Sequence, residues 1–328
     1  MGIRYLNRFL KENAQEAIVL TKLADMAGKK IAVDISIYMY RFASDNMLIE
    51  NIYLMLALFR QHRITPIFVF DGKPPDEKRE LLQKRREEKR EAEEEYNQLK
   101  RRLASVEDDA EKQELLYSMD MLKKKFVYIG KKDIEAVKRL IRGCGATYYD
   151  APGEADELCA LLAIQGKVWA CMSDDMDMFV YGCPRVLRYM SLLHHTTVVY
   201  DLPCILERLG ITQQELREIC VLSGTDYNLS RNDENAMVLS KTLKLFKKYH
   251  KSKGTDASTN RFYHWLQTHD PDSIEDMEEL KRITDMFDLS LPSHDHLRRF
   301  EKIHIEYGPF RAEDIQPILE EDGFLFAC

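Results

Sequence analysis

The sequence predicts an α/β protein built on a mainly parallel, twisted sheet with helices on both faces. Short runs rich in β-branched and aromatic residues alternate with helical patterns along the chain. Several of these runs are apolar throughout, which is typical of strands buried on both faces of a parallel sheet. The chain has 328 residues, 45% of them hydrophobic, so it can bury a large core and is not a disordered chain.

The predicted elements follow one another in a regular order. Strands are predicted at 31–34, 66–71, 146–150, 168–172, 186–190 and 196–200. Helices are predicted at 35–61, 133–143 and 153–165, with several more after residue 202. The last of the three named helices has Pro152 at its first turn, a common position for proline.

The stretch from residue 76 to residue 102 differs from the rest of the chain. Of its 27 residues 19 are charged, 10 basic and 9 acidic. By composition this is typical of a solvated helix held by i,i+4 ion pairs. A helix with so few apolar residues barely contacts a core, so we expect it to project from the body. Another helical stretch, at about 108–125, returns the chain.

Several acidic residues stand where a parallel α/β sheet binds ligands, beyond the carboxyl ends of its strands. Asp34 and Asp71 end two predicted strands, and Asp175 follows the strand at 168–172. Further acids occur in the segment 152–157, which opens a helix, and in the turn around Asp226. Taken singly, each has an ordinary explanation, as a helix-dipole partner, a cap or a turn residue.

Taken together, these acids predict a metal site. They have no basic partner in their own motifs, and in one crevice they would repel one another unless cations neutralised them. Oxygen ligands favour Mg²⁺, or Mn²⁺ in its place, over zinc. Two such ions about 4 Å apart are the usual arrangement for phosphodiester hydrolysis.

Five ordered motifs then carry a resemblance to a known family. They read VDIS at 33–36, VFDGKPP at 69–75, APGEAD at 151–156, DDMD at 174–177 and GTDY at 224–227. In these motifs, and in its first ten residues, the chain resembles the flap endonucleases and the wider XPG-type 5′-nuclease family up to about residue 250. The resemblance implies a PIN-like nuclease fold and seven metal-site acids: Asp34, Asp71, Glu154, Asp156, Asp175, Asp177 and Asp226.

The resemblance also implies a division of the chain into regions. It makes residues 1–328 a single 5′-nuclease domain, with an N-terminal nuclease region at 1–103 and an internal region at 126–230. A helical arch or clamp at 76–125 lies over the active site, and 231–328 form a C-terminal helical region that binds DNA.

Catalytic and DNA-contacting roles are implied for several single residues. Asp175 is counted as catalytic, and Lys78 and Arg85 match the catalytic base of the family's arch. Their spacing of seven puts both on one face of a helix. Tyr40 matches the aromatic residue that stacks on the nucleotide beside the cut, with core packing as the alternative. Gly2 matches the family's mature N-terminus, which contacts DNA.

The chain departs from the family pattern at three places. Asp156 stands where cellular eukaryotic members usually have Glu. The stretch 227–236 lacks the glycine pair of the family's helix–two-turn–helix motif, so Lys244, Lys247 and Lys248 are expected to contact the duplex instead. The segment between Tyr40 and residue 61 lacks a glycine-rich insertion that helps to recognise the junction. These departures would suit a large DNA virus or another divergent lineage.

The predicted function is therefore a metal-dependent, structure-specific 5′ nuclease. It would bind branched or flapped DNA and hydrolyse phosphodiester bonds near single-strand/duplex junctions, with 5′–3′ exonuclease activity as a further expectation, in replication or repair. One alternative is an endoribonuclease that degrades mRNA. Another is a non-catalytic scaffold of the same fold, which the presence of all seven acids disfavours.

Charge, cysteines and termini set the remaining expectations. The net charge of −7 argues against a nucleic-acid partner only if the charge is evenly spread. It is not evenly spread: residues 1–150 carry 29 basic and 25 acidic residues, whereas residues 151–328 carry 19 basic and 30 acidic residues. Seven cysteines without a CxxC pair indicate free thiols in a reducing, intracellular setting, whether the nucleus or a viral replication site in the cytoplasm. No membrane segment, sliding-clamp-binding box or zinc site at 294–296 is recognised, and a monomer is expected.

Overall fold

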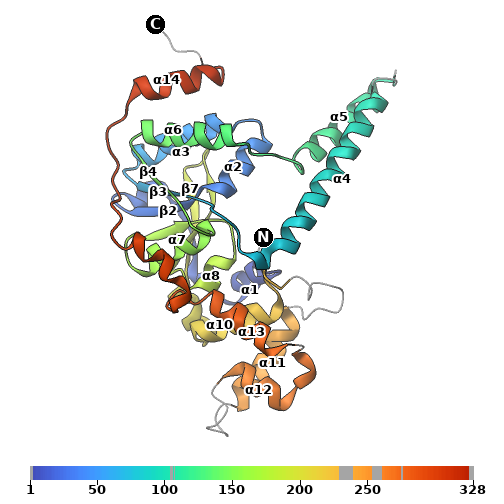
Figure 1. Cartoon of the computed structure of the whole chain (residues 1–328), viewed down its shortest axis with the longest axis vertical. Helices are drawn as coiled ribbons and strands as arrows, with labels where there is room; N and C mark the ends of the chain where they lie inside the picture. The colour runs from blue at the N-terminus through green and yellow to red at the C-terminus, as the bar shows by residue number, and fades with distance from the viewer. Residues whose placement is uncertain are drawn as a thin grey trace.

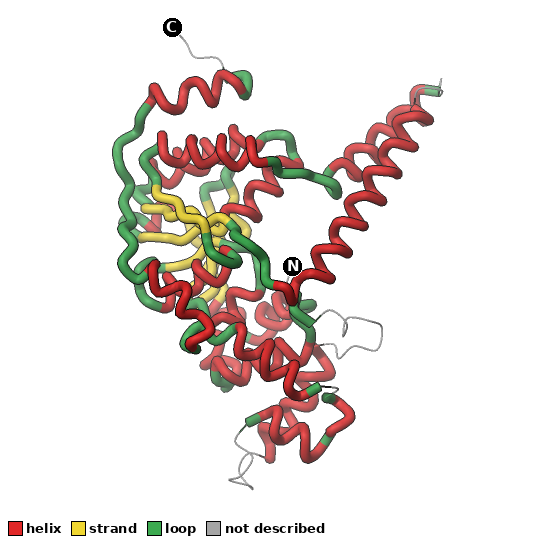
Figure 2. Tube along the Cα trace, in the orientation of Figure 1, coloured by secondary structure: helices red, strands yellow, loops and turns green. Residues whose placement is uncertain are grey.

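The chain folds around a seven-stranded sheet whose central part is parallel (Figures 1 and 2). The computed structural model describes residues 3–103, 106, 108–228, 239–252, 261–274 and 276–324. The strands are β1 (Ile18–Lys22), β2 (Lys30–Asp34), β3 (Thr65–Phe70), β4 (Thr147–Asp150), β5 (Ala170–Met172), β6 (Arg185–Ser191) and β7 (Thr196–Asp201). They are ordered β1-β7-β6-β5-β2-β3-β4, and all neighbours from β6 to β4 are parallel. The predicted fold class is confirmed.

Strand β1 is the one strand of this sheet that the sequence analysis missed. It lies at the sheet edge and pairs antiparallel with β7, with Leu20 opposite Val198. None of its residues is fully buried, and Val19 and Leu20 are exposed. The segment therefore lacks the buried, apolar pattern of the other strands, and only pairing with a strand far along the chain makes it a strand.

Helices cover both faces of the sheet (Figure 1). One layer contains α2 (Ile35–Ser44), α3 (Leu48–Gln61), α6 (Lys131–Gly143) and α14 (Ala312–Glu321). The other contains α1 (Leu6–Asn13), α7 (Ala155–Ile164), α8 (Asp177–Tyr181), α9 (Leu202–Leu209) and α10 (Gln213–Ser223). Side chains alternate between the two cores along the central strands, as in β2, where Ile31 and Val33 face the first layer and Ala32 the second.

Two predicted helices have different bounds in the structure. The helix predicted at 35–61 is divided into α2 and α3, because Asn46 adopts a left-handed backbone conformation, with φ of 55°. Asparagine tolerates this conformation better than most residues. The helix predicted at 153–165 begins only at Ala155, so Pro152 precedes the helix and is not in its first turn.

The charged stretch projects from the body as predicted (Figures 1 and 2). A short turn, η3 (Asp76–Lys78), leads into α4 (Arg79–Leu103), and α5 (Asp109–Lys123) returns alongside it. Leu81 and Ala92 are the buried residues described for α4. Past the end of α5 the ring of Phe126 packs 5.4 Å from that of Tyr96 on α4. The projecting pair is therefore stabilised chiefly by its own contacts.

The C-terminal part is helical and turns back onto the body. It contains α11 (Leu239–Ser252), α12 (Phe262–His269), α13 (Met277–Met286) and η6 (Pro292–Phe300). The remaining short turns are η1 (Gln15–Ala17), η2 (Leu23–Met26) and η5 (Pro271–Ser273). After η6 the chain runs back along the body and α14 packs on α6. No described helix is both long enough and apolar enough to span a bilayer.

Candidate active site

The topology of the sheet produces a crevice at the carboxyl ends of its parallel strands. From β2 the chain moves outward to β3 and β4, then crosses to β5 on the opposite side of β2. The strand order therefore reverses between β2 and β5, and such reversal points are where open α/β sheets bind ligands. Asp34 is the last residue of β2, Asp71 follows β3 directly, and Asp175 follows β5.

A cavity of about 540 Å³ opens at this edge. Six of the seven predicted metal-site acids line it, together with Tyr40, Lys78 and Arg85. The six acids are Asp34, Asp71, Glu154, Asp156, Asp175 and Asp226. Asp177, the seventh, does not line the cavity; it is 2% exposed and its backbone N–H donates to Asp175 Oδ1 at 3.0 Å.

One group of acids meets at the hydroxyl of Ser173, which is fully buried. Its oxygen lies 3.1 Å from Asp34 Oδ2 and 3.3 Å from Asp156 Oδ1, and it accepts a hydrogen bond from the Asp175 N–H at 3.2 Å. A serine hydroxyl has one hydrogen, so it donates to only one of the two carboxylates at a time. Ser173 thus links β2, α7 and the loop after β5.

Burial and like charges make this group costly to ionise. Burial and, next to it, the neighbouring Asp71 carboxylate raise the pKa of Asp34 to about 8. Burial and neighbouring carboxylates likewise hold the pKa values of Asp156 and Asp177 well above the ordinary range. Within the described part of the chain, Asp34 Oδ1 and Asp177 Oδ1 are buried without a hydrogen-bond partner. A cation would relieve both costs.

A second group joins the arch to the crevice. Lys78 Nζ donates to Glu154 Oε1 at 2.7 Å and lies 4.0 Å from Asp226 Oδ2. Arg85 Nη2 donates to the same Asp226 oxygen at 3.1 Å. Burial lowers the pKa of Lys78, but the carboxylates of Glu154 and Asp177 outweigh it and the net pKa is raised. Lys78 ends η3 and Arg85 lies on α4, so the two are not on one helix as predicted, but both side chains reach the same Asp226 oxygen.

The motif around Asp71 holds two loops close together. The Gly72 N–H donates to the Gly153 carbonyl at 2.7 Å, and Asp71 Oδ1 accepts from the Ala155 N–H at the start of α7 at 2.9 Å. A Cβ atom at Gly72 would lie 2.1 Å from the Ala151 carbonyl oxygen. Only glycine permits this approach, which sets Asp71 beside Glu154 and Asp156.

The residues present fit divalent cations that prefer oxygen. The donor set is entirely carboxylate, two buried carboxylate oxygens lack partners, and several pKa values are raised by mutual repulsion. As the side chains stand, no three histidine, cysteine, aspartate or glutamate groups of the described residues are arranged to hold one ion. Instead, the Lys78 ammonium group pairs with Glu154 and lies near Asp226, so an ion bound by these two acids would require Lys78 to move.

The other predicted contact residues lie at different places. Tyr40 is 46% exposed and lines the cavity, so the alternative of core packing is wrong for this residue. Lys244, Lys247 and Lys248 are exposed on α11 and do not line the cavity. The opposite face of α11 packs inward through Phe246 and Tyr249. Gly2 and residues 229–238 lie outside the described part of the chain.

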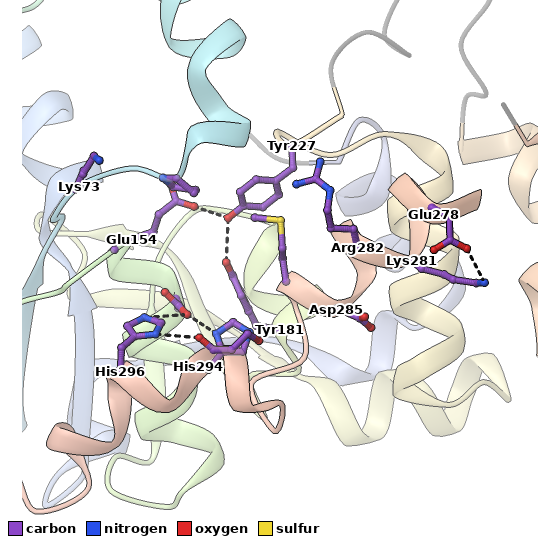
Figure 3. Close-up of a pocket in the computed structure, with 15 residues that line it drawn as sticks. Lys73, Glu154, Tyr181, Tyr227, Glu278, Lys281, Arg282, Asp285, His294 and His296 are labelled. Carbon is purple, nitrogen blue, oxygen red and sulfur yellow. Dashed lines mark hydrogen bonds and ion pairs between the residues drawn. The ribbon is translucent and has the colours of Figure 1, made fainter. Parts of the chain in front are cut away.

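Sequence reasoning missed several residues that shape the site. Ser173 was passed over within its own acidic motif. Tyr227 donates its hydroxyl hydrogen bond to Glu154, and its hydroxyl lies 3.0 Å from that of Tyr181 (Figure 3). The Lys78 ammonium group lies 4.9 Å from the centre of the Tyr227 ring. In the sequence, the signal for this contact was the tyrosine of the GTDY motif itself. A tyrosine hydroxyl needs a hydrogen-bond partner when it is buried.

A second cavity, of about 630 Å³, shares Gly153 and Glu154 with the first (Figure 3). Its lining includes His294, whose Nδ1 lies 2.5 Å from Glu157 Oε1. His296 Nε2 lies 3.6 Å from the same oxygen. The structure thus gives the histidine pair at 294–296 a buried carboxylate neighbour that the sequence did not reveal.

Comparison with known proteins finds matches over much of the chain. The model of the XPG N-terminal domain matches residues 1–92, and that of the XPG I-region matches residues 145–226. Flap endonuclease 1 of Glycine max is 31% identical over 248 residues, covering 69% of this chain and 62% of the relative. Flap endonuclease 1 of Mus musculus is 32% identical over 243 residues, covering 69% and 61%. The chain thus spans about 62% of the length of the first of these relatives.

Solved structures share the fold. The catalytic core of Rad2 in complex with a DNA substrate has a TM-score of 0.65 and 21% identity, covering 98% of this chain and 95% of that one. Human GEN1 in complex with Holliday junction DNA has a TM-score of 0.59 and 19% identity, covering 98% and 73%. With both XPG regions matched, together over more than half of its length, the chain belongs to the XPG family, which includes the flap endonucleases.

Proposed function

We propose that this protein is a structure-specific 5′ nuclease that hydrolyses phosphodiester bonds near junctions of single-stranded and duplex DNA. The observation that carries the proposal is the cavity at the strand-order reversal, where carboxylates from five segments meet Lys78 and Arg85 of the projecting arch. The membership of the XPG family supports the same activity. The relatives solved with DNA support a branched DNA substrate.

The carboxylates would hold two divalent cations, Mg²⁺ or Mn²⁺. Asp34, Asp71, Glu154, Asp156, Asp175, Asp177 and Asp226 are the residues proposed to hold them, directly or through water. When bound, such ions supply positive charge that activates a water molecule and stabilises the departing oxygen.

Lys78 and Arg85 would act on the phosphate that is cleaved. Both are held at the cavity by carboxylates, and a phosphate entering it would offer them oxygen atoms in place of Asp226. Because its carboxylate neighbours raise the pKa of Lys78, this residue stays protonated and acts as a cation, not as a proton acceptor. The two side chains would orient the phosphate and stabilise the charge that develops on it.

The duplex would be bound outside the cavity. The exposed lysines of α11, Lys244, Lys247 and Lys248, are proposed to contact the phosphate backbone, which gives affinity without sequence preference. This assigns duplex binding to the C-terminal region 231–328 of a chain acting as a monomer. Gly2 is proposed as a further DNA contact.

A cleavage assay tests the proposal. A duplex with a labelled 5′ single-stranded flap, incubated with the protein and Mg²⁺, should be cut near the junction. Asp175→Ala should abolish cutting while its circular dichroism spectrum stays that of the wild type. Parallel RNA substrates of the same shape test the endoribonuclease alternative. If the wild type cuts neither nucleic acid while a control nuclease cuts both, the proposal is wrong and a non-catalytic scaffold is favoured.

A further inference from the structure

Three separate segments meet at the side chain of Lys89 on the arch side of the cavity. Its ammonium nitrogen lies 4.7 Å from the centre of the Tyr40 ring on α2 and 5.5 Å from that of the Tyr128 ring, which follows α5. It also donates to the Val127 carbonyl at 2.9 Å. Both rings therefore lie against the same ammonium group.

Both rings keep much of their surface open to solvent. Tyr40 is 46% exposed and Tyr128 is 61% exposed, so neither ring is a core residue. The Tyr128 ring is nonetheless held in place, because its hydroxyl donates to Glu93 Oε2 at 3.0 Å on α4. Two exposed aromatic faces beside one cation offer a surface on which a flat ligand can stack. In the free protein, a cation–π contact with Lys89 covers part of each face.

The ligand that fits these features is an unpaired nucleobase. Flat aromatic faces stack on bases of any sequence, and only a single strand exposes both faces of its bases. Lys89 stands on a flexible four-carbon stem and lies beside Arg85, a second cation that repels it. Burial, and then Arg85, lower the pKa of Lys89. A base that stacks on the rings would take the place of the ammonium group there, and the repulsion by Arg85 favours that exchange.

We propose that Tyr128 and Tyr40 form a two-ring site that binds an unpaired base of the strand passing the arch, and that Lys89 occupies this site in the free protein. The proposal rests on the proposed nuclease function and adds Tyr128, which comes from outside every recognised motif. The site would select unpaired over paired strands without reading their sequence, because stacking requires a free base face and makes no base-specific hydrogen bond.

Binding measured without divalent ions tests this site separately from cleavage. Fluorescence anisotropy would compare a duplex carrying a 5′ single-stranded arm with the same duplex lacking the arm, so that the arm's contribution is isolated. Tyr128→Leu should weaken the arm's contribution about 10-fold, the effect of one lost stacked base, and Tyr128→Phe should preserve it. Tyr117→Leu is the matched control, since Tyr117 is a 68% exposed tyrosine on α5 of the same arch. Binding of the armless duplex should not change in any variant.

A spectroscopic signal separates stacking from a merely structural role. With 2-aminopurine placed at successive positions of the arm, one position near the junction should be quenched on binding to the wild type and Tyr128→Phe, but not to Tyr128→Leu. Equal losses in Tyr128→Phe and Tyr128→Leu would assign the effect to the hydroxyl bond with Glu93 and overturn the site. An arm that adds no affinity in the wild type would overturn it too, whether or not the protein cleaves flaps with Mg²⁺.

Discussion

At the scale of single residues, Ser173 shows how one neutral side chain organises a charged site. Its hydroxyl stands between Asp34 and Asp156 and receives the Asp175 N–H, so three proposed metal ligands are positioned by one buried atom. The sequence presents it as a small residue before an acidic run, with nothing to indicate this role. Residues that orient metal ligands commonly matter almost as much as the ligands themselves.

We expect Ser173→Ala to weaken divalent-ion binding about 10-fold, because Asp34 and Asp156 lose their shared hydrogen bond and are free to rotate. Titration calorimetry with Mn²⁺ measures this without substrate. Ser36→Ala is the control, since Ser36 lines the same cavity but, in the described structure, bonds to neither carboxylate. Unchanged Mn²⁺ affinity in Ser173→Ala would show that the hydroxyl does not position the ligands.

Arg85 should contribute to the chemical step more than to substrate binding. Its contact with Asp226 places the guanidinium group at the cavity, where it would meet the reacting phosphate. We expect Arg85→Ala to lower kcat about 100-fold and to change the Kd for a flap duplex much less. Single-turnover kinetics and anisotropy would measure the two quantities.

Arg90→Ala provides the control for Arg85→Ala. Arg90 lies on the same helix and pairs with Glu94 four residues on, with its side chain 70% exposed. It does not line the cavity. We expect its loss to leave kcat unchanged. An equal fall in kcat for both variants would instead indicate a general effect of arch charge.

At the scale of elements, the junction between the loop after β3 and the loop before α7 determines where the acids meet. Gly72 allows the two loops to touch, and the helix that follows begins at Ala155, whose N–H bonds to Asp71. The resemblance identified the glycine as part of a motif. Its physical reason, a close approach to the carbonyl of a residue far along the chain, is visible only in three dimensions.

Gly72→Ala should destabilise the fold and separate the two loops. The new methyl group would lie 2.1 Å from the Ala151 oxygen, so backbone must move, at a cost of about 1–3 kcal/mol. Urea denaturation measures the free energy of unfolding, and Mn²⁺ affinity reports whether the acids have separated. Gly130→Ala is the control, because a Cβ atom there meets only a side-chain oxygen, at 3.4 Å. Equal stability of the two variants would contradict the argument.

At the scale of the whole molecule, the buried acids couple folding to pH and to divalent ions. Because burial raises the pKa of Asp34 from 3.8 to about 8, the folded chain binds more protons than the unfolded chain between these values. Asp156 and Asp177 are shifted in the same direction. When the folded state binds more protons, stability falls as pH rises.

In EDTA, we therefore expect the free energy of unfolding to decrease between pH 5 and pH 8. Each additional proton held by the folded state contributes a slope of about 1.4 kcal/mol per pH unit. Mg²⁺ should reduce this decrease, because a bound cation stabilises the ionised acids. Asp34→Asn should also reduce it, in EDTA, by removing one titrating group. Stability that rises with pH in EDTA would show that these acids are not held protonated in the folded protein.

The sequence by itself determined the class of the fold, six of the seven strands, the projecting charged helix and six acids that line the cavity. It could do so because strand burial and helix charge are local patterns, and because the acids stand in recognisable motifs. It predicted one helix where α2 and α3 lie, and it did not reveal β1, since a left-handed asparagine and an edge pairing leave little local signal.

The tertiary structure alone decided which groups touch. The bond of Ser173 to two carboxylates, the contact of Tyr227 with Glu154 and the meeting of Tyr40, Lys89 and Tyr128 each join segments distant in sequence. The order of strands in the sheet brings these segments together, because that order reverses between β2 and β5 and so gathers several loops at one edge. No local pattern in the sequence encodes that reversal. It results from hydrophobic packing and strand pairing between segments along the whole chain.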